Sequence, residues 1–123
     1  MSQSDPRMSG SAIVLQANFV NFGAAETVYL AAPEAGFIKE IHVARYAAGG
    51  TNFSTLTLNT PSGAVSPTMA LATGGAAGDI DSQEFSKNDT NNVLAAGDGF
   101  SIVSDGLADG TPGGVVIVVL EVY

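Results

Sequence analysis

The sequence predicts an all-β protein: a single-domain antiparallel β-sandwich, jelly-roll-like, with about eight strands. In most segments apolar and polar residues alternate, which is the two-residue period of a strand with one buried face. Clusters of Gly, Pro, Asn and Asp divide these segments at intervals of roughly 10–12 residues. No segment sustains a helical period. A closed barrel is the alternative that this pattern leaves open, whereas the lack of an exact internal repeat argues against a solenoid or a propeller.

The N-terminal part of the chain divides into an arm and two strands. Residues 1–10 are polar and are interrupted by Pro6 and Gly10, so we expect a flexible arm at 1–10 and the β-sandwich domain at 11–123. Residues 11–20 alternate as a strand, although their freedom from Gly and Pro also permits a helix. Glu26–Ala31 is a shorter strand. The residues expected to face the core are Ile13, Leu15, Ala17, Phe19, Val28 and Leu30.

The next strand, at residues 37–46, alternates imperfectly. Phe37, Ile41 and Val43 are in phase, but Lys39 and Arg45 share that phase. One interpretation is a β-bulge that switches the phase within the strand. The other is that both faces are partly buried and the long cationic side chains reach out to solvent from the strand ends.

The middle of the chain predicts two strands and a long excursion. Residues 52–60 alternate most regularly, with Leu56 and Leu58 facing inward, and residues 68–73 offer Met69 and Leu71 as a second inward pair. Residues 74–92 are rich in Gly, Asp and Asn, so we expect a surface excursion with one short strand near Ile80. The chain then re-enters the core at residues 93–94.

The last thirty residues predict the strands around which the fold is organised. Residues 100–103 alternate, residues 105–114 form a turn-rich loop, and residues 115–120 are apolar without a break. We expect an antiparallel hairpin that closes the fold. Both faces of the final strand are apolar, so one should meet the core and the other should be covered by the N-terminal segment or by another subunit.

Composition and charge exclude several classes of protein. Charged residues make up 13% of the chain and apolar residues 46%, which is too apolar for a disordered protein and suggests surface that assembly covers. The formal net charge is −8, and the cations Arg7, Lys39, Arg45 and Lys87 are too few for a nucleic-acid surface. There is no cysteine, and we expect neither a signal peptide nor a membrane span.

The residues that could carry catalysis form no complete constellation. His42 is the only histidine, so a site with two imidazoles cannot form, and we expect a solvated or interface side chain. No Gly-x-Ser-x-Gly motif occurs. Asp79 and Asp81 are the nearest approach to a catalytic carboxylate pair, but a solvated glycine-rich loop would not raise the pKa of either. We therefore expect no enzyme activity and assign no catalytic residue.

Two groups of acids are candidates for a calcium site, because calcium prefers several carboxylate oxygens. They are Asp98, Asp105 and Asp109 in one group, and Asp79, Asp81 and Glu84 in the other. Their spacing does not match an EF-hand loop, and aspartates in turns commonly accept hydrogen bonds from their own backbone. The glycines show no phosphate-loop spacing. We assign no metal ligand, no cofactor-binding residue and no cofactor.

The order of these motifs resembles the small bacteriophage head decoration (capsid cement) proteins with a β-sandwich fold, from about residue 27 to residue 123. The steps Ala-Ala-Gly-Asp at 95–98 and Ser-Asp-Gly at 104–106, which flank a short apolar strand, contribute most to the likeness. The other matching parts are Thr27-Val28-Tyr29, Pro-Glu-Ala-Gly at 33–36, Phe-Ile-Lys-Glu-Ile at 37–41, Thr-Leu-Thr-Leu-Asn at 55–59, Gly-Asp-Ile-Asp at 78–81, and residues 115–123.

This resemblance implies a virion structural protein on the outer capsid surface. Such proteins bind the major capsid protein, commonly as homotrimers at local three-fold positions, and stabilise the head. Residues 1–10 or 11–20 are expected to contact the coat or a neighbouring subunit, with no nucleic-acid or membrane partner. The alternative is a carbohydrate-binding or tail-fibre-associated β-sandwich module. Sugar sites usually present flat aromatic rings, and without tryptophan only Tyr29, Tyr46 and Tyr123 could serve.

Overall fold

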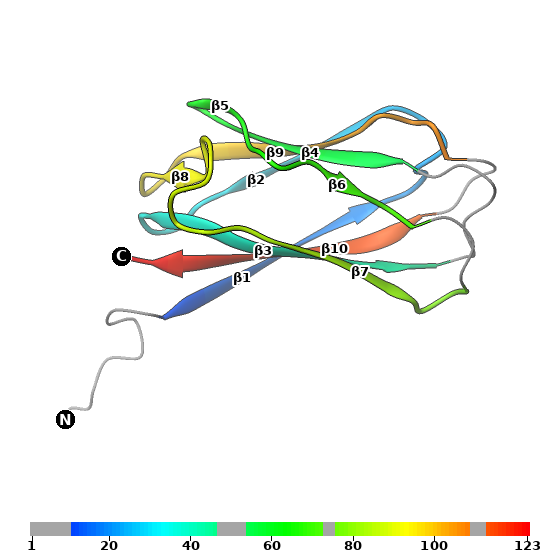
Figure 1. Cartoon of the computed structure of the whole chain (residues 1–123), viewed down its shortest axis with the longest axis horizontal. Coiled ribbons are helices and arrows are strands. Elements are labelled where there is room, and N and C mark those ends of the chain that lie inside the picture. The colour runs from blue at the N-terminus through cyan, green and yellow to red at the C-terminus, as the bar shows by residue number, and fades with distance from the viewer. Residues whose placement is uncertain (1–10, 47–53, 73–75, 109–112) are drawn as a thin grey trace.

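The computed structural model describes residues 11–46, 54–72, 76–108 and 113–123. Two antiparallel sheets pack face to face, which confirms the predicted all-β sandwich (Figure 1). No helix able to span a membrane occurs among these residues. The two sheets, A and B, have five strands each within the described part of the chain.

The described residues form ten strands, two more than the pattern of the sequence predicts. The additional ones are two-residue strands, which are too short to show a period. In sheet A the strands are β1 (Ala12–Phe19), β3 (Gly36–Arg45), β7 (Ile80–Glu84), β8 (Val93–Leu94) and β10 (Gly114–Val122). In sheet B they are β2 (Glu26–Ala31), β4 (Thr55–Thr60), β5 (Gly63–Ala64), β6 (Met69–Ala70) and β9 (Gly99–Ser104). Sheet A has the order β1-β10-β3-β7, with β8 also paired to β3; sheet B has the order β2-β9-β4-β5, with β6 also paired to β4.

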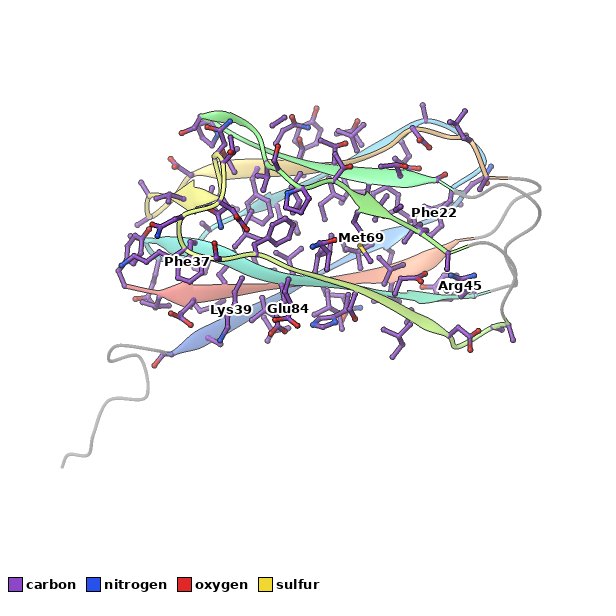
Figure 2. The ribbon with its side chains drawn as sticks, in the orientation of Figure 1. Phe22, Phe37, Lys39, Arg45, Met69 and Glu84 are labelled. Atoms are coloured by element: carbon purple, nitrogen blue, oxygen red, sulfur yellow. The ribbon has the colours of Figure 1, made fainter. Side chains whose placement is uncertain are left out.

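The core lies between the two sheets and follows the predicted alternation. Every second side chain of β10 is buried, from Val116 to Val122, and Phe100 and Ile102 of β9 are buried opposite them in sheet B. Met69 also lies between the sheets, whereas Lys39 and Glu84 project from the outside of sheet A (Figure 2). At about 1.5–3 kcal/mol for each fully buried aliphatic side chain, this layer is the main stabilising element.

Residues 11–20 do not cover the outer face of β10 as expected, whereas its coverage by another subunit stays a prediction. Val115, Ile117 and Val119 are half-buried. The strand that was expected over this face lies beside it instead: β1 pairs edge-on with β10, from Ala12 opposite Glu121 to Phe19 opposite Gly114. The two-residue period fixes which side chains share a face, but it does not say whether a neighbouring segment lies beside a strand or over it. The arm at residues 1–10 lies outside the described residues.

The predicted closing hairpin is wrong, because β9 and β10 belong to different sheets. β9 pairs with β2 and β4, and β10 pairs with β1 and β3. Both strands still bury their alternating apolar residues, because these side chains point into the core from opposite sheets. The two strands are not hydrogen-bonded to each other. The connection after Ser104 is long enough to cross from one sheet to the other, whereas a two-residue turn would have forced a hairpin.

The irregular strand contains a β-bulge, which confirms the first of the two interpretations. The register between β3 and β10 shifts between Val119 and Leu120, which oppose Glu40 and Ile38, so Lys39 is the extra residue. The inward phase therefore passes from Ile38 to Ile41. The alternative fails for Arg45, whose side chain points inward and is only 3% exposed.

The excursion at residues 74–92 contributes the predicted short strand, β7, which pairs with β3 at the edge of sheet A. Its first residue, Ile80, is 65% exposed, whereas Phe85 is buried directly after the strand. Leu94 re-enters the core as expected, while Val93 faces outward. The segment is therefore attached to the sandwich along a whole strand rather than at one point.

Asn92 anchors the end of this excursion to β3. Its amide nitrogen donates to the carbonyl oxygens of Ile38, at 3.0 Å, and Ser86, at 2.8 Å, and the residue is fully buried. We expect Asn92→Ala to lower the free energy of unfolding by about 2 kcal/mol, because two carbonyl groups lose their donor. Urea unfolding measures this loss. Asn88→Ala, at an exposed asparagine of the same segment, is the control and should change stability by less than about 0.5 kcal/mol.

Candidate interaction surfaces

The acidic residues that the sequence offers as calcium ligands are mostly engaged in their own turns. Asp79, Asp98 and Asp105 each accept a hydrogen bond from a nearby backbone amide: that of Ala76 at 2.9 Å, Ala95 at 2.8 Å and Leu107 at 3.1 Å, respectively. Glu84 is exposed on β7, and Asp109 lies outside the described residues. Within the described part of the chain, no group of three or more His, Cys, Asp or Glu residues could hold a metal ion.

Asp81 separates from Asp79 and forms a buried ion pair with Arg45 instead. The Arg45 guanidinium also donates to the carbonyl oxygen of Ala72 at 3.0 Å, and Asp81 accepts a bond from the Ala72 amide at 3.4 Å. β3 and β7 are thereby tied to the segment that follows β6 of sheet B. The two aspartates thus hold different structural elements, and the pair considered for catalysis does not form.

His42 lies in a row of polar side chains that the sequence did not reveal. Its Nδ1 is 2.7 Å from Ser82 Oγ, and its Nε2 is 2.8 Å from Glu40 Oε1. Ser82 is distant in the sequence and comes opposite His42 only through the register between β3 and β7. The three side chains lie on the outer face of sheet A.

The edge of sheet A formed by β1 is unusual for this chain. The sequence of β1, Ala-Ile-Val-Leu-Gln-Ala-Asn-Phe, contains no charged residue and no proline, and its ladder with β10 has no bulge. The other long edge strands carry acids: Asp81 and Glu84 on β7, and Glu26 on β2. The edge strands β5 and β6 have two residues each. Charges, bulges and shortness protect edges from pairing with other chains, and β1 has none of these devices.

The backbone of β1 presents its free hydrogen-bonding groups at four positions. The Val122 amide donates to the Ser11 carbonyl oxygen, so residues in phase with Ser11 bond to β10. In an antiparallel ladder the intervening residues direct both their N–H and C=O groups to the opposite side. These residues are Ala12, Val14, Gln16 and Asn18, and no strand of the described chain pairs with them there.

The side chains at the start of β1 add apolar surface to this edge. Val14 is 62% exposed on the outer face, and Ile13 and Leu15 are only half-buried on the inner face, where they pack against the core from its margin. Val20, just beyond the strand, is 80% exposed. The edge therefore combines backbone groups that pair with no described strand with apolar side chains on both faces. An additional strand beside β1 would cover both.

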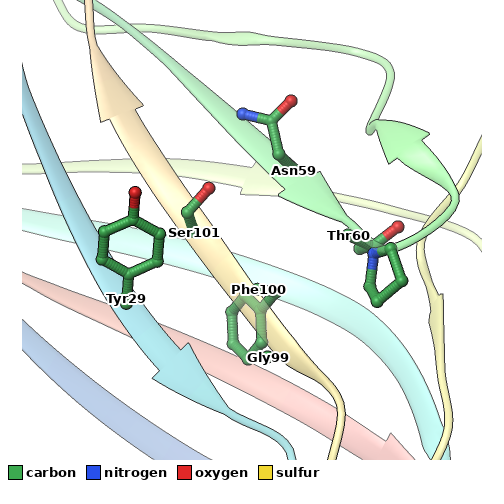
Figure 3. Close-up of a pocket in the computed structure, with 7 residues that line it drawn as sticks. Tyr29, Asn59, Thr60, Gly99, Phe100 and Ser101 are labelled. Carbon is green, nitrogen blue, oxygen red and sulfur yellow. The ribbon is translucent and has the colours of Figure 1, made fainter.

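The outer face of sheet B differs from that of sheet A because none of its strand residues is charged. Its outward residues are Thr27, Tyr29 and Ala31 of β2, Gly99, Ser101 and Val103 of β9, and Thr55, Thr57 and Asn59 of β4. A shallow hollow of about 360 Å³ lies on this face and is lined by Tyr29, Asn59, Thr60, Pro61, Gly99, Phe100 and Ser101 (Figure 3). Sheet A carries Glu40, Glu84, Glu121 and Lys39 on or beside its outer face.

Comparison with known proteins places the fold among viral capsid structures. No model of a known protein family matches the chain, and no curated protein matches it in sequence. A chain of the cyanophage Pam1 capsid asymmetric unit superposes with a TM-score of 0.53 at 14% sequence identity, covering 100% of this chain and 93% of that one. A chain from infectious bursal disease virus, strain Gx, gives a TM-score of 0.25 at 13% identity, covering 100% of this chain and 41% of that one.

The cyanophage comparison shows the fold: a β-sandwich like that of a viral capsid chain over nearly the whole length of both chains. It agrees with the architecture derived from the strands. The likeness of the infectious bursal disease virus chain is too distant to add to this.

Proposed function

We propose that this chain is a virion structural protein that binds the outer surface of an assembled phage capsid and stabilises the head. Two observations support the proposal: the β-sandwich resembles a cyanophage capsid chain, and β1 is an uncharged edge strand whose outer side pairs with no strand of the described residues. The edge is the main support, because an uncharged edge strand without a bulge is suited to pairing with a strand of another chain.

A strand of the coat protein added beside β1 would satisfy the free groups of Ala12, Val14, Gln16 and Asn18. Each backbone hydrogen bond contributes about 1 kcal/mol net, and burying Val14 adds about 1–2 kcal/mol. A single edge would therefore give only modest affinity. Firm attachment follows when several copies are linked, because each further contact becomes intramolecular.

The proposed homotrimer at a local three-fold position would link three copies in this way. Symmetry then bears on whether β1 pairs with the coat protein or with another copy of this chain. Two copies of β1 paired with each other would form a two-fold interface and hence a dimer. Pairing in a ring of three would need a second, different edge on each copy, and the remaining long edges carry Glu26 or the acids of β7. We therefore assign β1 to the coat rather than to a neighbouring copy.

The mechanism in this proposal is mechanical and needs no catalysis. The decoration protein buries surface against the coat, so detachment or separation of coat subunits must first break these contacts. Such a protein stabilises the particle by mass action, because it binds the assembled state and not the dissociated one. The row of His42, Ser82 and Glu40 then serves as ordered polar surface.

Light scattering and head binding test this proposal. We expect the purified chain to have three times the chain mass of 12.4 kDa, and to co-sediment with phage heads assembled without it. Decorated heads should also withstand heating to a higher temperature than undecorated ones. A stable monomer that fails to bind such heads would refute the proposal, and a dimer lost on mutation of β1 would refute the assignment of β1 to the coat.

A further inference from the structure

The hollow on the outer face of sheet B has the composition of a small-ligand site. Tyr29, Ser101 and Asn59 lie in one row across β2, β9 and β4, because Ser101 is opposite both of the others in the two ladders. All three side chains project from the same face of the sheet (Figure 3). Neighbouring strands are about 4.8 Å apart, so the row spans about 10 Å, the size of one sugar ring and its substituents.

Gly99 creates the space beside this row. It is the next outward residue along β9, and a Cβ built on it would meet nothing closer than the Leu30 carbonyl oxygen at 3.9 Å. Neither a close contact nor a positive φ angle demands glycine here. The absence of a side chain at Gly99 leaves the space beside Ser101 open.

The polar groups in the row are free to bind a ligand. Within the described part of the chain, no hydrogen bond to the protein engages the Tyr29 hydroxyl, the Ser101 hydroxyl or the Asn59 amide. Together they offer donors and acceptors, as a hydroxyl-bearing ligand requires. Tyr29 is 78% exposed, and its ring presents a flat apolar surface beside them.

The charge pattern indicates a neutral ligand. No residue that lines the hollow is charged, so neither an anion nor a cation would find a counter-ion there. Asp98 immediately precedes Gly99, and the chain as a whole carries −8, which disfavours anionic sugars and phosphates. An aromatic platform with uncharged donors and acceptors matches the apolar C–H face and the hydroxyl groups of a neutral sugar.

We propose that this hollow binds a neutral sugar unit of a polysaccharide, with Tyr29 stacking on the ring and Asn59 and Ser101 bonding to its hydroxyl groups. The site lies on the outer face of sheet B, whereas the edge assigned to the coat belongs to sheet A. Sugar binding and capsid attachment are therefore tested by different measurements, and failure of one would not refute the other.

Saturation-transfer NMR with the full chain tests the proposal. The probes are glucose, galactose, mannose and N-acetylglucosamine with their neutral trisaccharides, and glucuronic and sialic acids as charged comparisons. We expect transfer to at least one neutral sugar and none to the acids. Tyr29→Ala should weaken the interaction at least tenfold, and Gly99→Val should do the same by filling the hollow.

Two controls make the result decisive. Tyr46→Ala removes another exposed tyrosine outside the hollow and should leave the sugar signal unchanged. Gly99→Val should have a urea midpoint equal to or above that of the wild type, because a β-branched residue favours a strand. Absence of transfer to every neutral sugar would overturn the proposal, and so would transfer that survives both Tyr29→Ala and Gly99→Val.

Discussion

Replacing Arg45 with alanine is expected to lower the free energy of unfolding by about 3–5 kcal/mol. The side chain of Arg45 is 2% exposed and that of Asp81 is 16% exposed, so the variant would leave the Asp81 carboxylate largely buried without its cation. The Ala72 carbonyl oxygen would lose a donor as well. An unpaired charge and an unsatisfied carbonyl group, both shielded from water, are among the costliest defects that a point mutation introduces.

Urea unfolding followed by far-ultraviolet circular dichroism measures this effect, and two further variants show its cause. Lys39→Ala removes the partner of Glu121 in an exposed pair, whose side chains are 47% and 29% accessible, and should cost less than about 1 kcal/mol. The double variant Arg45→Met, Asp81→Leu removes both buried charges and should recover most of the loss. If Arg45→Ala alone costs less than about 1 kcal/mol, the buried pair is not what joins β3, β7 and the segment after β6.

The sequence predicts which side chains of each strand face the core, but not which strands pair with one another. The inward positions of β1, β2, β4 and β10 follow the two-residue period, because burial of alternate side chains is a local property of a strand. The placement of β9 and β10 in separate sheets could not be predicted in this way. A strand that buries Phe100 and Ile102 does so equally well beside β10 or opposite it, and only the pairing of β9 with β2 and β4 distinguishes the two arrangements.

The candidate surfaces depend on registers that join distant parts of the chain. Tyr29 is recognisable from the sequence as an available aromatic residue, but the hollow beside it exists only because β9 brings Gly99 and Ser101 between β2 and β4. Likewise, the uncharged composition of β1 is plain in the sequence, whereas its position at an edge is not. The contacts of His42 with Ser82 and of Arg45 with Asp81 required the pairing of β3 with β7.

The proposed attachment to the coat through β1 predicts that removing one hydrogen-bond donor from the free edge weakens binding. Gln16 directs its N–H group to the free edge, so Gln16→Pro removes a donor from that edge while sparing the ladder with β10. Thr27→Pro is the matched control: the Ala32 amide bonds to the Asp98 carbonyl oxygen, so the N–H of Thr27 also points away from its own sheet, at the edge formed by β2. Both residues are exposed in edge strands.

The most direct measurement is the affinity of these two variants for phage heads that lack the protein, determined by co-sedimentation beside the wild type. Gln16→Pro should bind at least about 100-fold more weakly, because every copy in the assembly loses the same contact. Thr27→Pro should bind like the wild type, and both should keep its circular dichroism spectrum. Wild-type affinity of a folded Gln16→Pro variant would contradict attachment through β1.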